Sequence, residues 1–177
     1  MSSDNWCSPP EVDAGLWELN DGPVDCDPCS NERSIIRAHT TYATGGLVLP
    51  WNPRRRRKAK TYENPPYSNL LAWTLKGLYE LGRASGPAEL VRLVPVATST
   101  AWWRHAVLAE GEPARRVPRP LVIFTRRIAF IDETNTVING ARFDAALFFY
   151  FVHDRARRIR QALRAFRSLT SWHREAS

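Results

Sequence analysis

The residues that most clearly suggest chemistry are Asn64-Pro65-Pro66-Tyr67, which follow a short predicted strand at residues 61–63. The two prolines fix the backbone and remove two N–H donors, so the neighbouring carbonyl oxygens can face a ligand without local competition. The Asn64 side-chain oxygen and the Pro65 carbonyl would accept the two hydrogens of an amine conjugated to a purine ring. These two hydrogen bonds would favour a pyramidal amine nitrogen as the amine attacks a methyl group. Tyr67 would stack on the base, which must first leave the duplex. The alternative is an ordinary proline-rich turn.

Charge is divided unevenly along the chain. Residues 1–32 contain eight acids and no Lys or Arg, whereas the remaining 145 residues carry all 25 Lys and Arg against 10 acids, within a total net charge of +7. A basic body favours a polyanionic partner, usually nucleic acid, because each phosphate it neutralises releases condensed counterion. The alternative is that the arginines only keep the protein soluble.

Length and composition predict one compact domain of 177 residues. The chain has no run of eighteen apolar residues and an acidic first segment, so we expect a cytoplasmic protein with no membrane partner. Cys26 and Cys29 are spaced like half of a zinc site, but a second pair or histidines would be needed, so we predict reduced thiols and no metal. No feature of the sequence points to a particular oligomeric state.

Periodicity predicts strands and helices in an α/β order. Ser68 is the predicted N-cap of a helix over residues 70–81, and Gly82 is placed to end it. The other predicted helices cover residues 12–19 and 154–166, with one more opening at Trp102. The predicted strands cover residues 23–28, 61–63, 90–94, 121–125, 127–131 and 145–152. Strands clustered late in the chain indicate an antiparallel end to the sheet.

The helix predicted at 154–166 is amphipathic. Its apolar side would consist of Ala156, Ile159, Leu163 and Phe166. Its opposite side carries Arg155, Arg157, Arg158, Arg160 and Arg164, which would either contact a DNA backbone or form a solvated face.

A second basic feature lies at residues 53–60, where a charge run predicts an exposed loop. Its basic side chains are Arg54, Arg55, Arg56, Arg57, Lys58 and Lys60. Beside a pocket for a flipped base, such a run would hold phosphates, although in many proteins it is only a solvated loop.

The order of these segments resembles the phage DNA adenine methyltransferases of the Dam-like group. Trp6-Cys7-Ser8-Pro9 is similar to the family's Trp-x-Thr-Pro opening, and Asp27-Pro28-Cys29-Ser30 to its Asp-x-Cys-Ala segment. Asn64-Pro65-Pro66-Tyr67-Ser68 matches the catalytic loop. Residues 93–103 resemble Leu-Leu-Pro-x-x-x-x-Thr-x-Trp-Trp, and Arg127-Ile128-Ala129-Phe130 resembles Arg-Leu-x-Phe. The similarity runs from about Trp6 to Phe151.

The resemblance implies a single-domain Rossmann-like methyltransferase fold at residues 1–153, with a mostly parallel sheet and an antiparallel end. A basic helix and tail would follow at residues 154–177. It further implies site-specific methylation of the N6 amine of a flipped adenine in DNA, with S-adenosylmethionine as cofactor. The residues expected near the cofactor are Ser8, Pro9, Asp27 and Cys29; those expected near DNA include Trp103 and Arg127. Asp27 could otherwise be a turn residue before proline, and Trp102 and Trp103 could be core residues.

Two departures from the family pattern suggest rival functions. Gly45 stands where the family usually has an acid before Gly-Leu, and there is no glycine-rich GxGxxG turn. A catalytically weak relative that only binds DNA is therefore one alternative. A methyltransferase acting on an RNA amine is another, because the same loop serves other amine substrates; the basic body argues against protein glutamine.

Overall fold

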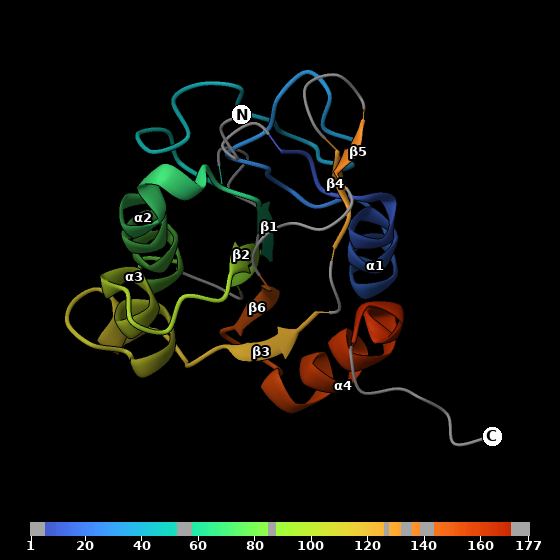
Figure 1. The fold of residues 1–177 in the computed structure, drawn as a ribbon. Helices are drawn as coiled ribbons and strands as arrows, with labels where there is room; N and C mark the ends of the chain where they lie inside the picture. Colours follow the sequence, from blue (N-terminus) through green and yellow to red (C-terminus); the bar gives the residue numbers. More distant parts are fainter. Residues whose placement is uncertain are drawn as a thin grey trace.

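A mixed four-stranded sheet forms the centre of the protein (Figure 1). The computed structural model describes residues 6–52, 58–84, 88–125, 128–131, 136–138 and 144–170. The sheet order is β1 (Ala59–Glu63), β2 (Ala88–Pro95), β6 (Ala145–Phe151) and β3 (Leu121–Phe124). β1 and β2 are parallel, and β6 runs against both of its neighbours, so β1, β2 and β3 point the same way. The predicted α/β class is confirmed, and the antiparallel pairing occurs at the β6–β3 end of the sheet, where β6 is the reversed strand.

Isolated bridges continue the parallel side of the sheet beyond β1. Cys26 pairs with Thr61, Val24 with Ala38 and Asp27 with Thr41, all in parallel orientation. The segment predicted as a strand at residues 23–28 therefore makes isolated bridges and is not a continuous strand. One reason is that the Lys60 backbone N–H donates to the side chain of Asp25, at 2.9 Å, where a regular ladder would use a main-chain carbonyl.

Two pairs of helices cover the two faces of the sheet. α1 (Pro10–Asn20) and α4 (Arg155–Ala165) lie on one side, and α2 (Leu70–Gly82) and α3 (Ala101–Trp103) on the other (Figure 1). A π-helical turn, Arg104–Leu108, continues α3. Because side chains alternate along a strand, β2 and β6 contribute odd-numbered residues to the core beneath α1 and α4 and even-numbered residues to the core beneath α2 and α3.

The remaining elements are short. β4 (Phe130–Ile131) and β5 (Val137–Ile138) form a two-stranded antiparallel pair, and 3-10 turns occur at Tyr67–Asn69, Ala114–Arg116 and Arg167–Leu169. None of the helices in the described ranges is both long and apolar enough to cross a membrane.

Most predicted elements are confirmed, with two local corrections near the proposed catalytic loop. Ser68 is not the N-cap of α2, because residues 67–69 form a 3-10 turn and Asn69 is the residue preceding the helix. Ala59 and Lys60 are not part of a loop: they begin β1, paired with Ala88 and Glu89.

The buried side of α4 differs from the predicted one. Ala156 and Leu163 are exposed, whereas Ala162, Ala165 and Arg158 are buried. The reason is long-range. The last carbonyls of α1 need donors, and the Arg158 guanidinium donates to the Leu19 carbonyl at 2.7 Å.

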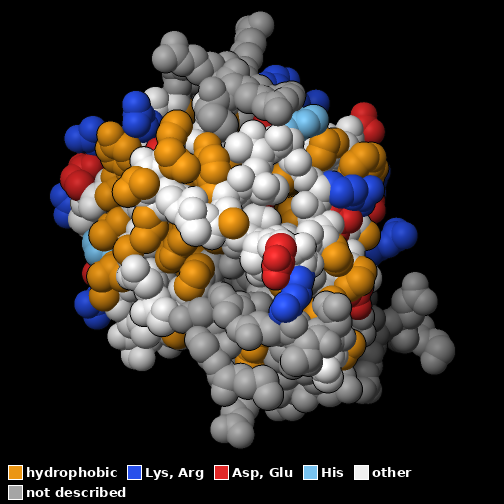
Figure 2. Space-filling view, turned by 90° about the horizontal axis from the view of Figure 1, so that it is seen from above, with side chains coloured by type: hydrophobic (Ala, Val, Ile, Leu, Met, Phe, Trp, Pro, Cys, Tyr) orange, Lys and Arg blue, Asp and Glu red, His pale blue; other side chains and the backbone are white. Residues whose placement is uncertain are grey.

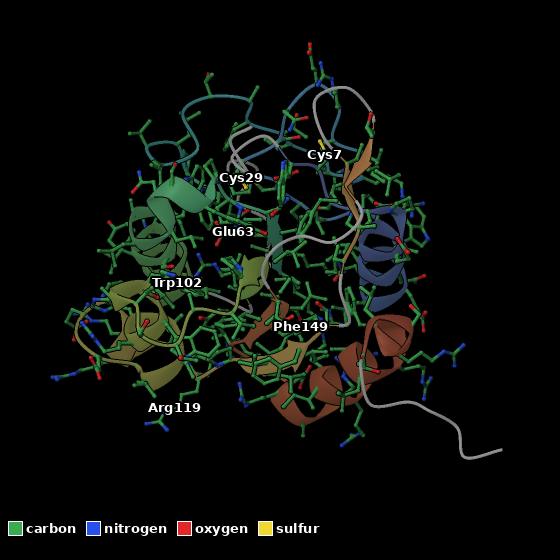
Figure 3. The ribbon with its side chains drawn as sticks, viewed as in Figure 1. Cys7, Cys29, Glu63, Trp102, Arg119 and Phe149 are labelled. Atoms are coloured by element: carbon green, nitrogen blue, oxygen red, sulfur yellow. The ribbon has the colours of Figure 1, made fainter. Side chains whose placement is uncertain are left out.

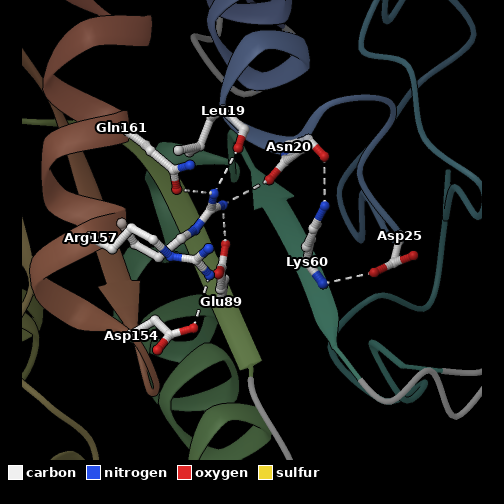
Figure 4. A network of polar contacts seen from close by, with 9 residues as sticks. Leu19, Asn20, Asp25, Lys60, Glu89, Asp154, Arg157 and Gln161 are labelled. Atoms are coloured by element: carbon white, nitrogen blue, oxygen red, sulfur yellow. Dashed lines mark hydrogen bonds and ion pairs between the residues drawn. The ribbon is translucent and has the colours of Figure 1, made fainter.

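Three further bonds complete the Arg158 network, part of which is drawn in Figure 4. Its guanidinium donates to the side chains of Asn20 (3.2 Å), Gln161 (2.9 Å) and Glu89 (2.5 Å). α4 is thereby fastened to α1 and β2 and shares their core. The boundary between residues 153 and 154 stays a prediction.

Candidate active site

Three of the segments singled out by sequence meet at the carboxyl ends of neighbouring parallel segments. Residues 24–27 and β1 run side by side in the register Cys26↔Thr61, so the residues that follow each of them come together. Residues 6–9 also reach this end of the sheet, where Trp6 is hydrogen-bonded to Asn64 and Ser8 to Tyr62. Figure 3 shows Cys7, Cys29 and Glu63 in this part of the molecule. The carboxyl edge of parallel strands is where open α/β sheets bind ligands.

Asn64 is held by bonds from three directions. Its side-chain Nδ2 donates to the Trp6 carbonyl at 2.8 Å, and its Oδ1 accepts from the Tyr67 hydroxyl at 3.2 Å. Its backbone N–H donates to the thiol of Cys29. The donor side of the amide is therefore turned to Trp6, and the oxygen is turned toward Tyr67.

Tyr67 is half-buried, and its ring has an aromatic neighbour. The ring lies edge-on to Phe130, with centroids 6.5 Å apart, and Phe130 also contacts Trp6 at 5.4 Å. Burial raises the pKa of the Tyr67 phenol well above its usual value, so the hydroxyl stays a proton donor to Asn64 at neutral pH. Phe130 belongs to the segment that resembles the family's Arg-Leu-x-Phe, but its position beside Tyr67 was not predicted from sequence.

Asp27 is a buried carboxylate, only 3% exposed. Its oxygens accept hydrogen bonds from the Cys29 backbone N–H (3.2 Å) and the Ser34 hydroxyl (3.4 Å). Burial raises the pKa of Asp27 to about 6, and these neutral donors only partly oppose that effect. A positively charged ligand group would favour the ionised carboxylate. The ammonium of S-adenosylmethionine is such a group, so Asp27 fits the predicted cofactor.

Ser8 and Pro9 are both buried at the start of α1. The Ser8 hydroxyl is 2.6 Å from the Tyr62 hydroxyl, and the Pro9 carbonyl accepts the Val12 N–H at 3.0 Å. The polar groups of both residues are thus used within the protein, and their contact with a cofactor stays a prediction.

The loop that carries Gly45 docks against the Asp27 segment. A side chain at Gly46 would place its Cβ 1.8 Å from the Pro28 carbonyl oxygen, so only glycine fits this approach. The Gly46 carbonyl also accepts the Trp51 indole N–H at 2.7 Å. Position 45, where the family pattern has an acid, is therefore at the edge of the site.

Three of the residues predicted to contact DNA lie in the described ranges, namely Lys58, Lys60 and Trp103. Trp103 is only 7% exposed and packs edge-on against Phe148 at 5.3 Å, so it is a core residue here and cannot present its ring to DNA. The Lys60 ammonium donates a hydrogen bond to the Asn20 carbonyl at 2.7 Å. Burial lowers the pKa of Lys60. Lys58 is exposed.

Five predicted DNA contacts lie outside the described residues, namely Arg54, Arg55, Arg56, Arg57 and Arg127. Figure 2 views the molecule from above. Hydrophobic side chains gather on the side where α2 lies in Figure 1, and described Lys and Arg side chains lie mostly along the outline. This view shows no continuous basic patch among the described residues, and the DNA-binding surface stays a prediction.

Sequence reasoning missed Glu63 and Arg92, an ion pair beneath the site with no exposed side-chain surface. The signal was available, since Arg92 interrupts an apolar run in a strand predicted to be central. Such a charge needs a buried partner.

The cysteines are free thiols, and burial raises the pKa of Cys26 to about 12. In the described ranges, no group of three or more His, Cys, Asp or Glu side chains is arranged to hold a metal ion.

A comparison with known protein families finds a match over almost the whole chain. The sequence model of a family described as DNA N-6-adenine-methyltransferase (Dam) matches residues 1–170. No curated protein matches the chain significantly.

Proposed function

Because the chain belongs to the DNA N-6-adenine-methyltransferase (Dam) family, whose members take their methyl group from S-adenosylmethionine, we propose that it methylates the N6 amine of a flipped adenine at specific DNA sites. The observation that carries this proposal is the position of Asn64. It follows β1 directly, is held by Trp6 and Tyr67, and lies in one cluster with Asp27 and Cys29.

Asn64 and Pro65 would bind the reacting amine. The Trp6 carbonyl occupies the Nδ2 side of Asn64, so the amide presents oxygen, and not nitrogen, to an incoming donor. An amine that gives its two hydrogens to this oxygen and to the Pro65 carbonyl has its lone pair freed from the ring and directed at the methyl group. As positive charge develops on nitrogen, both acceptors stabilise it.

The Tyr67 hydroxyl now occupies the oxygen that the substrate amine would use. Substrate binding would therefore replace one internal hydrogen bond by another, and the tyrosine ring would be free to move onto the base. Base–aromatic stacking of this kind contributes about 1–3 kcal/mol.

S-adenosylmethionine supplies an electrophilic methyl group on a sulfonium. Asp27 would bind the positively charged methionine portion, because its carboxylate is surrounded by neutral donors and lacks compensation for burial. Cys29 joins this position to the catalytic loop through the Asn64 N–H. Cofactor and amine would thus be held by adjoining backbone segments, as transfer over a short distance requires.

The sheet is consistent with a Rossmann-like methyltransferase fold, which we include in the proposal. Three of its four strands point the same way, and parallel bridges extend that side through residues 24–27 and 38–41. Ligands of such folds bind where the strands end, which is the position of Asp27 and Asn64.

The test is to express the protein in cells that lack adenine methylation and to sequence modified bases in their DNA. We expect N6-methyladenine in one sequence context. Methylated amines in RNA alone would move the substrate to RNA. DNA binding with no methylated nucleic acid would support the inactive relative that Gly45 suggests, and would overturn the proposed activity.

A further inference from the structure

Glu63 and Arg92 form an ion pair in the core, directly beneath the catalytic loop. They are opposite each other in the β1–β2 ladder, and Arg92 Nε contacts Glu63 Oε1. Neither side chain has any exposed surface. Figure 3 shows Glu63 between α2 and the sheet.

The surroundings of this pair are apolar and aromatic. On the same face, Leu90, Val94 and Phe148 pack beneath α2 and α3. The Tyr150 hydroxyl lies beside Arg92 and donates to the Ala106 carbonyl at 3.0 Å. Among the described residues no further hydrogen bond satisfies the carboxylate or the guanidinium.

Such a pair is poorly explained by stability. Removing two charges from water costs about as much as their attraction returns, and apolar side chains of similar volume are often as stable or more so. The incomplete hydrogen bonding increases that cost. An ion pair does provide specificity. It favours the one register of the two strands in which the charges meet, whereas apolar side chains can pack in more than one register.

The register that this pair favours is the one that places the catalytic loop. Glu63 is the last residue of β1 and is bonded covalently to Asn64. Both charges also act on Cys29, whose thiol accepts the Asn64 N–H: Glu63 raises its pKa and Arg92 lowers it. The pair is therefore adjacent to Asn64 along the chain and within electrostatic range of its neighbour in space.

We propose that Glu63 and Arg92 are positioning residues for methyl transfer: their ion pair fixes the end of β1 so that the Asn64 and Pro65 oxygens meet the reacting amine. Neither residue touches substrate. The inference rests on the proposed function, because the loop that it positions is the one assigned to adenine.

The experiment compares two double variants of the full chain. Glu63→Leu/Arg92→Met removes the pair and leaves an apolar core. The matched control, Glu89→Leu/Arg158→Met, removes the other largely buried ion pair of β2, which faces α4. Each variant is measured for melting temperature, kcat, and KM for both substrates, at a temperature where it is folded.

We expect Glu63→Leu/Arg92→Met to keep or raise the melting temperature and to keep KM for S-adenosylmethionine within about threefold. Its kcat should fall on the order of a hundredfold, the effect of misplacing a reacting group by about 1 Å. The control should melt at a lower temperature with kcat within about threefold of wild type. A folded Glu63→Leu/Arg92→Met protein with wild-type kcat would overturn the proposal.

Arg92→Lys is a second variant, which tests the proposal if the Glu63→Leu/Arg92→Met protein does not fold. It preserves the charge but loses the planar guanidinium, so kcat should lie between those of wild type and the apolar variant. Wild-type kcat in Arg92→Lys would contradict the proposal.

A readout independent of turnover separates this inference from the proposed function. Amide hydrogen exchange in the peptide containing Asn64–Tyr67 should be about tenfold faster in Glu63→Leu/Arg92→Met and unchanged in the control. A wild type that makes no N6-methyladenine overturns the proposed function. Unchanged exchange in the variant overturns the positioning role, whatever the reaction is.

Discussion

Buried charged side chains are compensated differently at the two ends of the β1–β2 pair. At the amino end, Arg158 is paired with Glu89 and donates to further oxygens on α1 and α4 (Figure 4). At the carboxyl end, Glu63 and Arg92 have each other and the Tyr150 hydroxyl, and Asp27 has only neutral donors. At the amino end a charge with four hydrogen bonds joins helices to the sheet, although its Nε has no partner among the described residues, while charges with fewer partners collect at the carboxyl end. We therefore propose that the amino end supports the architecture and that the carboxyl end binds the ligand and carries out the reaction.

The largest expected effect belongs to the carboxyl end. Asn64→Ala removes the acceptor that we propose stabilises positive charge on the amine, so kcat should fall by about 10²–10³ or more while the fold survives. Initial rates of labelled methyl transfer to DNA measure this. Asn69→Ala, an exposed change in the turn before α2, is the matched control and should keep wild-type kcat. Near-normal turnover in a folded Asn64→Ala protein would remove Asn64 from the mechanism.

The amino end should respond in the opposite way, through stability and not through kcat. Arg158→Met leaves Glu89 and the Leu19 carbonyl without their donor, so the free energy of unfolding should fall by about 3 kcal/mol or more. Urea unfolding measures the loss. kcat at a temperature where the variant is folded should stay within about threefold of wild type. A large fall in kcat with unchanged unfolding would mean that the two ends do not divide their roles in this way.

Asp27 gives a pH test of the carboxyl end. Its carboxyl is raised to a pKa of about 6 by burial, so it becomes neutral as the pH falls through that value and should bind the cationic cofactor less tightly. Titration calorimetry should therefore show the affinity of wild type for S-adenosylmethionine falling up to about tenfold per pH unit below 6. Asp27→Asn should bind about tenfold more weakly at pH 8, with little change between pH 5 and 8.

Stability provides the control for Asp27, with the opposite sign. A carboxyl whose folded pKa lies above its usual value of 3.8 favours the folded protein at low pH, and that contribution is lost as the pH rises to about 6. Asp27→Asn should therefore be more stable than wild type at pH 8, by up to about 3 kcal/mol, but not at pH 4. If Asp27→Asn and wild type were equally stable at pH 8 as well as at pH 4, ionisation of Asp27 would carry no cost. The carboxylate would then not be waiting for a cation to compensate its burial.

Tyr67→Phe should have the smallest effect. The change removes the hydroxyl that occupies Asn64 Oδ1 but keeps the ring for stacking. We expect KM for DNA to stay constant or fall about threefold, with kcat within about threefold of wild type. Tyr67→Ala, which also removes the ring, should lose about 1–3 kcal/mol of binding to the base. A hundredfold loss in Tyr67→Phe would make the hydroxyl itself part of the chemistry.

Local features of the fold were predictable because short-range rules decide them. The spacing of Leu70, Leu78 and Leu81 predicts α2, and the apolar run at residues 90–94 predicts β2; both are present. The Asn64–Tyr67 loop was recognisable because its four residue types are constrained together. The family match supports that recognition.

Long-range features were not predictable from the same rules. In a helical pattern Arg158 looks like a surface residue, and its burial depends on acceptors far away along the chain, such as Asn20, 138 positions away, and Glu89. The sequence fits Trp103 equally well as a DNA contact or as a core residue. In the structure its ring packs against Phe148 in the core. The partner of Arg92 and the carbonyl that orients Asn64 likewise depend on which strands and segments become neighbours.

The most direct test of the central claim is mass spectrometry of nucleosides from DNA incubated with purified protein and S-adenosylmethionine. We expect N6-methyladenine with wild type and a loss of at least a hundredfold with Asn64→Ala. A methyl group on cytosine, or equal amounts of N6-methyladenine from both proteins, would contradict the assignment of the carboxyl end of β1 as the site of adenine methylation.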